Sequence, residues 1–193
     1  MRQLKQRKNT SANQLFDMAR RTDIIIGLTG KKRSGKTTAA NYLCSGYDRC
    51  GYQAARLGIS DYLKNKMHLI TGPLTDEEKC QVRVSLQNLA DFFKSRHGSM
   101  FFVEQWLKSY QEMRERGVNV FIIDDVRYPY EAEFIRDRGG EVIRIKRPET
   151  DSIHDTHSSE TSVDEIVPDH MVEASDVAAL TQQLTRLFGL HHD

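Results

Sequence analysis

The sequence has few cysteines, no long apolar run and no excess of one charge. Its three cysteines, Cys44, Cys50 and Cys80, are odd in number and lack metal-ligand spacing, so they predict reduced thiols in a cytoplasmic compartment. No stretch is apolar over enough residues to span a membrane, so no membrane partner is expected. The formal net charge of +1 argues against a generally basic surface that binds nucleic acid.

Length and composition predict one domain preceded by a short basic arm. With 193 residues, 38% hydrophobic and 28% charged, the chain can bury one core but is too short for two ordinary domains. Residues 1–22 differ from the rest of the chain in composition. They contain a single acid, Asp17, and the basic residues Arg2, Lys5, Arg7, Lys8, Arg20 and Arg21. This arm lacks the apolar centre of a secretory signal. We interpret it as a solvated, partly helical segment before a domain at residues 23–193; a role in nucleic-acid binding or organelle targeting is the alternative.

After the arm, strand and helix patterns alternate without repeats, which predicts an α/β fold with a five-stranded parallel sheet and helices on both faces. The expected strands are Ile24–Thr29, Ala54–Ile59, Val118–Asp124, Glu141–Lys146 and His170–Glu173. The expected helices are Lys36–Ser45, Asp61–Leu69, Asp76–Arg96, Val103–Arg116, Tyr130–Arg138 and Asp176–Leu187.

The longest expected helix carries both a core face and a polar pair. Thr75 and Glu78 form a capping box at its start, and Gly98 ends it. An apolar stripe that we interpret as core consists of Val82, Leu86, Leu89 and Phe93. Arg83 and Gln87 are four residues apart, so both side chains lie on one helix face and can address one ligand together.

The most informative segment is a phosphate-binding loop from Gly30 to Thr37, which follows the apolar run Ile24–Leu28. A buried strand that ends in a glycine turn lets backbone N–H groups and a helix N-terminus face phosphate oxygens. Lys36 then reaches the β- and γ-phosphates, and the Thr37 hydroxyl can hold Mg²⁺. The residues expected at the nucleotide are Gly30, Lys32, Arg33, Ser34, Gly35, Lys36, Thr37 and Thr38. The alternative is a glycine turn with solvated lysines.

A second informative segment delivers two carboxylates, Asp124 and Asp125, to the carboxyl end of an apolar strand. Ligands bind at that edge of an open α/β sheet, where a carboxylate can hold Mg²⁺ through water opposite Thr37. Acidic turns after strands are common, so this spacing is only moderately specific. Arg127 follows where a second phosphate could be met, although a surface arginine paired with Glu131 or Asp125 is the alternative.

Several motifs, taken in order, resemble the deoxynucleoside monophosphate kinases of tailed bacteriophages. The matching segments are Lys32–Lys36, Ser60–Lys64, Arg83 with Leu86 and Gln87, Asp125–Glu133, Arg147 with Pro148, and Asp155–Glu160. The resemblance runs from about Ile24 to the C-terminus and implies a nucleoside-monophosphate-kinase-like P-loop NTPase fold. It also implies ATP and Mg²⁺ as cosubstrates, a deoxynucleoside monophosphate as phosphoryl acceptor, and a place in the host cytoplasm if the gene belongs to a phage.

The resemblance also assigns roles to residues. It maps Arg83, Gln87 and Arg127 onto the acceptor side, with Ser60, Lys64 and Arg96 as weaker candidates. It maps residues 147–165 onto a lid, in which Arg147 would bring a charge to the phosphates, and it aligns Asp125 rather than Asp124 with the Mg²⁺-organising acid. The catalytic set is therefore Lys36, Asp125, Arg127 and Arg147, and the metal set is Thr37 and Asp125. Ala90-Asp91-Phe92 departs from the family pattern, so base selectivity is not carried over.

Two other functions stay open on the sequence alone. One is a P-loop kinase for another small acceptor, such as dephospho-coenzyme A, because the phosphate loop does not name the acceptor. The other is a non-catalytic module that binds a nucleoside triphosphate and signals through its basic arm. A guanine-selecting Asn-Lys-x-Asp motif is missing, since Asn65-Lys66-Met67-His68 lacks the Asp. Whether the chain forms a homodimer is also left open.

Overall fold

The computed structural model describes residues 23–148 and 158–190. Its strands are β1 (Ile24–Thr29), β2 (Ala54–Arg56), β3 (Val120–Ile123), β4 (Glu141–Lys146) and β5 (His170–Glu173). Its helices are α2 (Lys36–Arg49), α3 (Asp61–Thr71), α4 (Asp76–His97), α5 (Phe101–Glu115), α6 (Pro129–Arg136), α7 (Ser158–Thr161) and α8 (Val177–Phe188), with a 3-10 turn, η2, at Ser162–Glu165. The basic arm and residues 149–157 of the expected lid lie outside the described residues.

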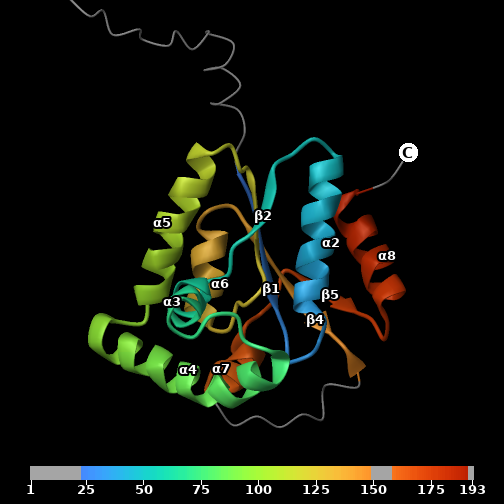
Figure 1. Cartoon of the computed structure of the whole chain (residues 1–193). Coiled ribbons are helices and arrows are strands. Elements are labelled where there is room, and N and C mark those ends of the chain that lie inside the picture. The colour runs from blue at the N-terminus through green and yellow to red at the C-terminus, as the bar shows by residue number, and fades with distance from the viewer. Residues whose placement is uncertain (1–22, 149–157, 191–193) are drawn as a thin grey trace, which may run out of the picture.

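The strands form one sheet in the order β2-β3-β1-β4-β5, and every neighbouring pair is parallel. Helices α5 and α6 cover one face, and α2 and α8 cover the other (Figure 1). The expected α/β class, with a five-stranded parallel sheet between two helical layers, is confirmed. The order places β1 in the middle, so the phosphate-binding loop that follows β1 lies at the centre of the sheet edge.

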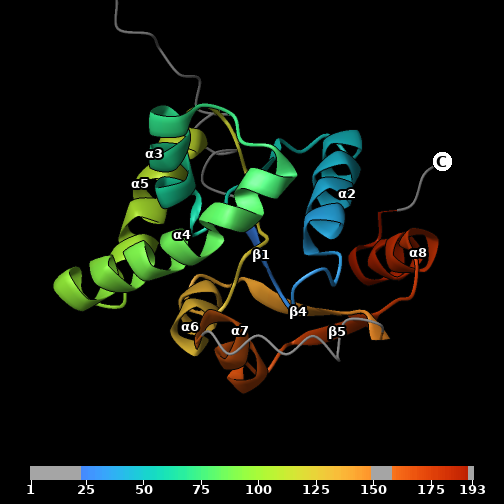
Figure 2. The same ribbon diagram turned by 60° about the horizontal axis from the view of Figure 1, so that its bottom comes forward.

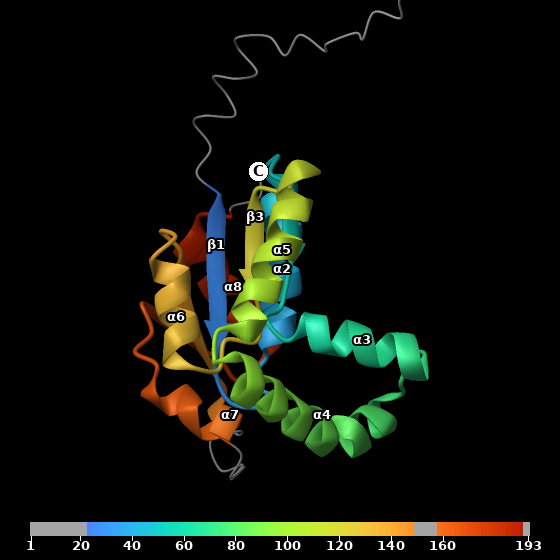
Figure 3. The same cartoon turned by 90° about the vertical axis from the view of Figure 1, so that its left-hand side faces the viewer.

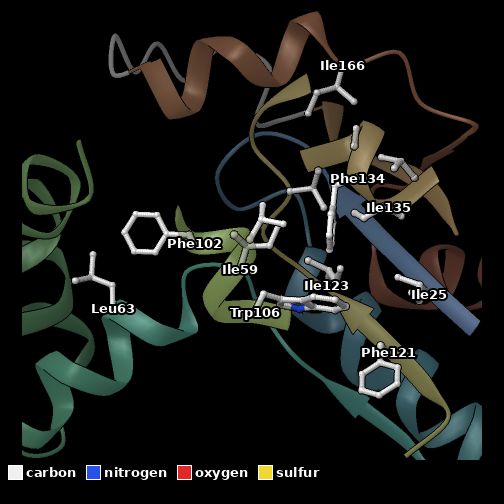
Figure 4. Packing of buried hydrophobic residues seen from close by; sticks show 14 residues of the cluster. Ile25, Ile59, Leu63, Phe102, Trp106, Phe121, Ile123, Phe134, Ile135 and Ile166 are labelled. Atoms are coloured by element: carbon white, nitrogen blue, oxygen red, sulfur yellow. The ribbon is translucent and has the colours of Figure 1, made fainter. Parts of the chain in front are cut away.

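Successive side chains of the central strands enter different cores because a strand presents alternate residues to opposite faces. Ile25 packs with α5 and α6, whereas Ile26 packs with α2 and α8. In β3, Phe121 and Ile123 take the first side and Ile122 takes the second. Figure 4 shows the first core, in which Trp106 of α5 lies among residues of β1, β3 and α6. Burial on both faces explains the almost continuous apolar runs of these strands.

Several observed boundaries differ from the expected ones: α2 runs on to Arg49 instead of ending at Ser45, β3 is Val120–Ile123 instead of Val118–Asp124, and β2 ends at Arg56 instead of Ile59. The Leu57 N–H still donates to the Ile122 carbonyl at 2.9 Å, but the chain then turns, and the Asp61 N–H donates to the Gly58 carbonyl at 3.2 Å. The turn lets α3 begin at Asp61, as expected. Arg56 therefore lies at the carboxyl end of the edge strand.

Helices α3 and α4 extend away from the carboxyl end of the sheet (Figure 3). The capping box of Thr75 and Glu78 is present, and Gly98 ends α4, as expected. The apolar stripe of α4 is only partly core: Leu86 and Phe93 pack against the first core, but Leu89 is 38% exposed. This narrow contact follows because α4 covers an end of the domain and not a face of the sheet.

The C-terminal part of the expected lid is fixed to the sheet and not loosely held. Figure 2 shows α7 next to α6 at this end of the molecule. The side chains of Val163 and Ile166 are buried, with 1% and 2% exposed. The guanidinium of Arg144 in β4 donates to both of their carbonyls, at 2.7 and 2.6 Å. No helix among residues 23–148 and 158–190 combines the length and apolarity needed to cross a membrane.

Trp106 connects the first core to the turn that precedes α3. Its side chain is 2% exposed, and its Nε1–H donates to the Leu57 carbonyl at 2.8 Å. We expect Trp106→Phe to lower the free energy of unfolding by about 1–3 kcal/mol, because it leaves a small void and a carbonyl without its partner. Urea denaturation measures the loss, and Phe92→Leu on the exposed side of α4 is the control, with a change within about 0.5 kcal/mol. A Trp106→Phe protein as stable as the wild type would contradict this account.

Candidate active site

The loop between β1 and α2 has the backbone geometry of a phosphate cradle. Gly30 has φ 141°, and a Cβ atom there would lie 2.2 Å from the Ile145 carbonyl oxygen, so no other residue fits without moving β4. Gly35 has φ 100° and caps α2 in the left-handed region. Arg33, with φ 65°, is the one non-glycine residue with positive φ in the described part of the chain. These conformations turn the loop sharply before the N-terminus of α2, where backbone N–H groups favour anions.

Lys36 is held over this loop by the loop's own oxygens. Its Nζ donates to the Gly30 carbonyl at 2.8 Å, to the Lys31 carbonyl at 2.7 Å and to Ser34 Oγ at 3.4 Å. The residue is only 8% exposed. The loop thus places one ammonium group at the N-terminus of α2, where phosphate oxygens would meet it. Arg33 of the loop and Thr37 and Thr38 at the start of α2 are exposed, and Lys32 of the loop is partly exposed.

The carboxylate next to Thr37 is Asp124, and this corrects the expected pairing with Asp125. Thr37 Oγ1 donates to Asp124 Oδ2 at 3.0 Å, and Asp124 is 5% exposed. Asp124 and Asp125 follow an extended strand, so their side chains leave the backbone in different directions. The resemblance aligned the neighbouring residue, and sequence alone does not fix which of two consecutive acids faces the loop.

Asp125 is directed to the start of α3. It accepts hydrogen bonds from the Ile59 N–H at 2.7 Å and the Ser60 N–H at 3.1 Å, from the Ser60 hydroxyl, and from Lys64 Nζ at 3.2 Å. Burial by itself would raise the pKa of Asp125, but Lys64 and the hydrogen bonds outweigh it and hold the pKa well below its usual range. Asp125 is therefore an anion that fixes the wall of the neighbouring cavity.

A cavity of about 260 Å³ opens between α3, α4 and the segment after β3. The expected acceptor-side residues that line it are Ser60, Lys64, Arg83, Gln87 and Arg127. Arg96 does not line it and is exposed further along α4. The cavity wall is largely apolar, with Leu63, Leu86 and Phe102 among its members, so charged groups converge on a surface that can also take a ring. The structure thus brings together residues that are up to 67 positions apart in the sequence, from Ser60 to Arg127.

An acid and a lysine that the sequence did not assign to the site also line this cavity. Asp91 and Lys94 continue the face of α4 that carries Gln87, and their Oδ1 and Nζ atoms lie 2.7 Å apart. Lys94 Nζ also donates to the Tyr128 hydroxyl at 2.8 Å. The sequence could have indicated these two residues, because Gln87, Asp91 and Lys94 have the spacing of one helix face. The prediction included only Arg83 and Gln87 from this face.

Glu131 lies at the back of the cavity with its carboxylate out of water. Its Oε2 accepts hydrogen bonds from the Arg127 N–H at 2.7 Å and the Tyr128 N–H at 3.1 Å. These two residues directly precede α6. Burial raises the pKa of Glu131 to about 8, although these donors oppose the rise. Glu131 is thus bound to the backbone of Arg127 and Tyr128, and its carboxylate is buried.

Arg56 and Arg147 lie at the carboxyl end of the sheet on either side of the loop strand. Arg56 ends β2, and its Nη1 donates to both carboxylate oxygens of Asp124 at 3.0 Å. Arg56 was absent from the predicted site because the expected strand ran on to Ile59, which moved its carboxyl end three residues along. Arg147 directly follows β4, whose Ile145 carbonyl abuts Gly30, and it does not line the cavity.

Thr37 and Asp124 fit a magnesium ion by the chemistry of their donors. A hydroxyl and a carboxylate oxygen 3.0 Å apart, beside a phosphate cradle, are the hard oxygen ligands that Mg²⁺ takes from a kinase, with phosphates and water completing its shell. Within the described residues there is no cluster of three or more His, Cys, Asp or Glu side chains that could hold a metal without such help.

Comparison with known proteins identifies relatives. A sequence model of the deoxynucleotide monophosphate kinase family matches residues 62–183. The chain is 32% identical over 164 residues to a protein of Acanthamoeba polyphaga mimivirus, covering 72% of this chain and 82% of the viral one. That protein carries a provisional description as a deoxynucleotide monophosphate kinase. The resemblance found in the sequence is confirmed, with a giant virus and not a bacteriophage as the source of this relative.

Solved structures resemble the chain more distantly. Shikimate kinase from Aquifex aeolicus matches with 12% identity and a TM-score of 0.48, over 86% of this chain and 96% of its own. The APS kinase of Mycobacterium tuberculosis matches with 12% identity and a TM-score of 0.43, over 88% and 96%. Similarity at these values says nothing about the substrate of the chain.

Glu131 makes the stability of the domain depend on pH. An acid whose pKa rises from 4.5 to about 8 on folding binds its proton more tightly in the native state. Its contribution is therefore complete below pH 4.5 and is lost as the pH rises towards 8. We expect the wild type to lose stability across this window relative to Glu131→Gln, with a slope difference of up to about 1.4 kcal/mol per pH unit.

Urea denaturation of both proteins between pH 5 and 9 measures this difference, at pH values on both sides of the raised pKa. Glu133→Gln, a change of an exposed acid in the same helix, is the control and should follow the wild type. Parallel curves for the wild type and Glu131→Gln would show that Glu131 is ionised in the native state at neutral pH.

Proposed function

Since the chain belongs to the deoxynucleotide monophosphate kinase family, we propose that it transfers the γ-phosphoryl group of ATP to a deoxynucleoside monophosphate and so forms the diphosphate. The observation that carries the proposal is the extent of the family match. Residues 62–183 include α4 and the segment after β3, which line the cavity, and they do not include the generic phosphate loop at residues 30–37. The match therefore bears on the acceptor, which a phosphate loop alone does not name.

In this proposal the two halves of the site bind different nucleotides. The Gly30–Gly35 turn, Lys36 and the α2 N-terminus take the phosphates of ATP, and the cavity takes the monophosphate. Arg83 and Arg127 are suited to the dianionic acceptor, because guanidinium groups bind phosphate through paired N–H donors. They also reduce the repulsion between the acceptor and ATP phosphates, which must come close for transfer.

Catalysis then consists of positioning and charge stabilisation. The acceptor phosphate oxygen is already deprotonated at neutral pH, so no general base is required, and Asp125 keeps the structural task described above. Lys36 stabilises the charge that develops on the transferring phosphoryl group and the β-phosphate. Mg²⁺, held by Thr37 and through Asp124, would neutralise the same phosphates. A neutral Glu131 at pH 7 would spare the acceptor phosphate a nearby negative charge.

The first test of the function is ADP release in a coupled assay with one candidate acceptor at a time. We expect release with at least one deoxynucleoside monophosphate and none with dephospho-coenzyme A. Lys36→Ala is the control, and it should lose about 100-fold or more in turnover while keeping the wild-type circular dichroism spectrum. Transfer to dephospho-coenzyme A alone would favour the kinase for another acceptor, and no transfer together with tight ATP binding would favour the regulatory module.

A second test separates the two halves of the site. Arg83→Ala and Arg127→Ala should each raise the Michaelis constant for the monophosphate, or lower turnover, by about tenfold or more, because each removes a cation from the acceptor cavity. The affinity for a fluorescent ATP analogue should stay within about twofold of the wild type. Arg96→Ala is the matched control on the same helix, because Arg96 does not line the cavity. Lost ATP affinity with an unchanged acceptor Michaelis constant would place both arginines on the wrong side.

A further inference from the structure

Arg56 makes an ionic contact to the carboxylate of Asp124 beside the phosphate loop. Its Nη1 lies 3.0 Å from Asp124 Oδ1 and 3.0 Å from Asp124 Oδ2. Asp124 is 5% exposed, so the guanidinium compensates an acid that has little contact with water. The attraction of Asp124 and Asp61 raises the pKa of Arg56 against the effect of its own burial.

Arg56 and Thr37 hold the same carboxylate between them. Asp124 Oδ2 accepts hydrogen bonds from Thr37 Oγ1 and from Arg56 Nη1, each at 3.0 Å, and Asp124 Oδ1 also accepts one from Arg56 Nη1. Two donors from two different elements fix the rotation of the carboxylate. The carboxylate of an aspartate with a single partner would be freer to rotate. A metal ligand that is oriented before the ion arrives loses less freedom on binding, and the partners of ligating carboxylates are known to tune metal affinity.

The other end of the guanidinium reaches towards the acceptor cavity. Arg56 Nη2 lies 3.4 Å from Asp61 Oδ2, which also accepts the Gly58 N–H at 2.8 Å. Asp61 Oδ1 in turn accepts from Lys64 Nζ at 3.2 Å. The Arg56 side chain is 36% exposed, but both of its Nη atoms are engaged by acids, Nη1 by Asp124 and Nη2 by Asp61.

We propose that Arg56 is a positioning residue that orients Asp124 for the magnesium ion of the bound nucleotide, without touching the nucleotide itself. The inference rests on the proposed function, because it assumes that Thr37 and Asp124 serve a nucleotide-bound metal. It predicts that the loss of Arg56 weakens nucleotide binding only when Mg²⁺ is present. A phosphate-binding arginine would instead contribute to binding with and without the metal.

The experiment is a titration of the full chain with a fluorescent ADP analogue, once in Mg²⁺ and once in EDTA. The magnesium gain is the dissociation constant measured in EDTA divided by the dissociation constant measured in Mg²⁺. The proteins are the wild type, Arg56→Gln, Arg56→Lys and, as control, Arg114→Gln. Arg114 is also an arginine paired with an aspartate, since its Nε lies 2.8 Å from Asp23 Oδ2, but Asp23 precedes β1 and so lies at the other end of the sheet from the loop.

We expect Arg56→Gln to lose about tenfold or more of the magnesium gain, while its affinity in EDTA stays within about twofold of the wild type. Arg56→Lys should lose part of the gain, because an ammonium group replaces the planar fork. Arg114→Gln should match the wild type in both solutions. If Arg56→Gln lacks the wild-type circular dichroism spectrum, Arg56→Lys alone decides, with a reduced gain supporting the proposal.

Two results would overturn the proposal. A wild-type magnesium gain in the folded Arg56 variants would show that Asp124 does not need Arg56. An equal loss of affinity in Mg²⁺ and in EDTA would show that Arg56 binds phosphate or shapes the loop itself. A wild-type protein without any magnesium gain would instead overturn the metal site in the proposed function, and this outcome is recognised before any variant is measured.

Discussion

The site depends on two consecutive carboxylates at the end of β3 that must each be stabilised by a different part of the chain. Asp124 is held by Thr37 of α2 and Arg56 of β2, and Asp125 by Lys64 and the backbone at the start of α3. A carboxylate buried at this depth costs free energy unless such partners compensate it. The hydrogen bonds and ion pairs of these two acids connect the phosphate loop, the edge strand and the cavity wall to the end of β3. They therefore fix how the two halves of the site face each other.

Most of the fold could be predicted because its signals are local and periodic. The central strands are buried on both faces, so they appear in the sequence as apolar runs of strand length, and the bounds of β1, β4 and β5 agree with the expected ones. The capping box of Thr75 and Glu78 marked the start of α4. Where packing departs from periodicity, the prediction was weaker: Leu89 belongs to the apolar stripe of α4 but is 38% exposed, because that helix covers an end of the domain.

The site could be predicted by residue type but not by pairing. The loop glycines carry their own backbone requirement, and Arg83 and Gln87 share a helix face whatever the rest of the chain does. The choice between Asp124 and Asp125 depends on which way a side chain leaves the strand end, and a shift of one residue reverses it. Arg56 was missed for a related reason, because its role follows from the residue at which β2 ends. Val163 and Ile166 show that a polar sequence can still be anchored by two buried side chains.

Acidic and basic side chains alternate at the carboxyl end of the sheet. This arrangement explains how a site for two polyanions can contain so many acids. Three carboxylates, those of Asp61, Asp124 and Asp125, lie close to where phosphates would bind, and each would repel them if unpaired. Arg56 lies between Asp124 and Asp61, and Lys64 lies between Asp61 and Asp125, so the acids are neutralised by groups that they in turn immobilise. In the proposed kinase, Lys36 and the cavity arginines act on phosphate. The paired acids serve to keep the walls of the two half-sites in a fixed relation while phosphoryl transfer takes place between them.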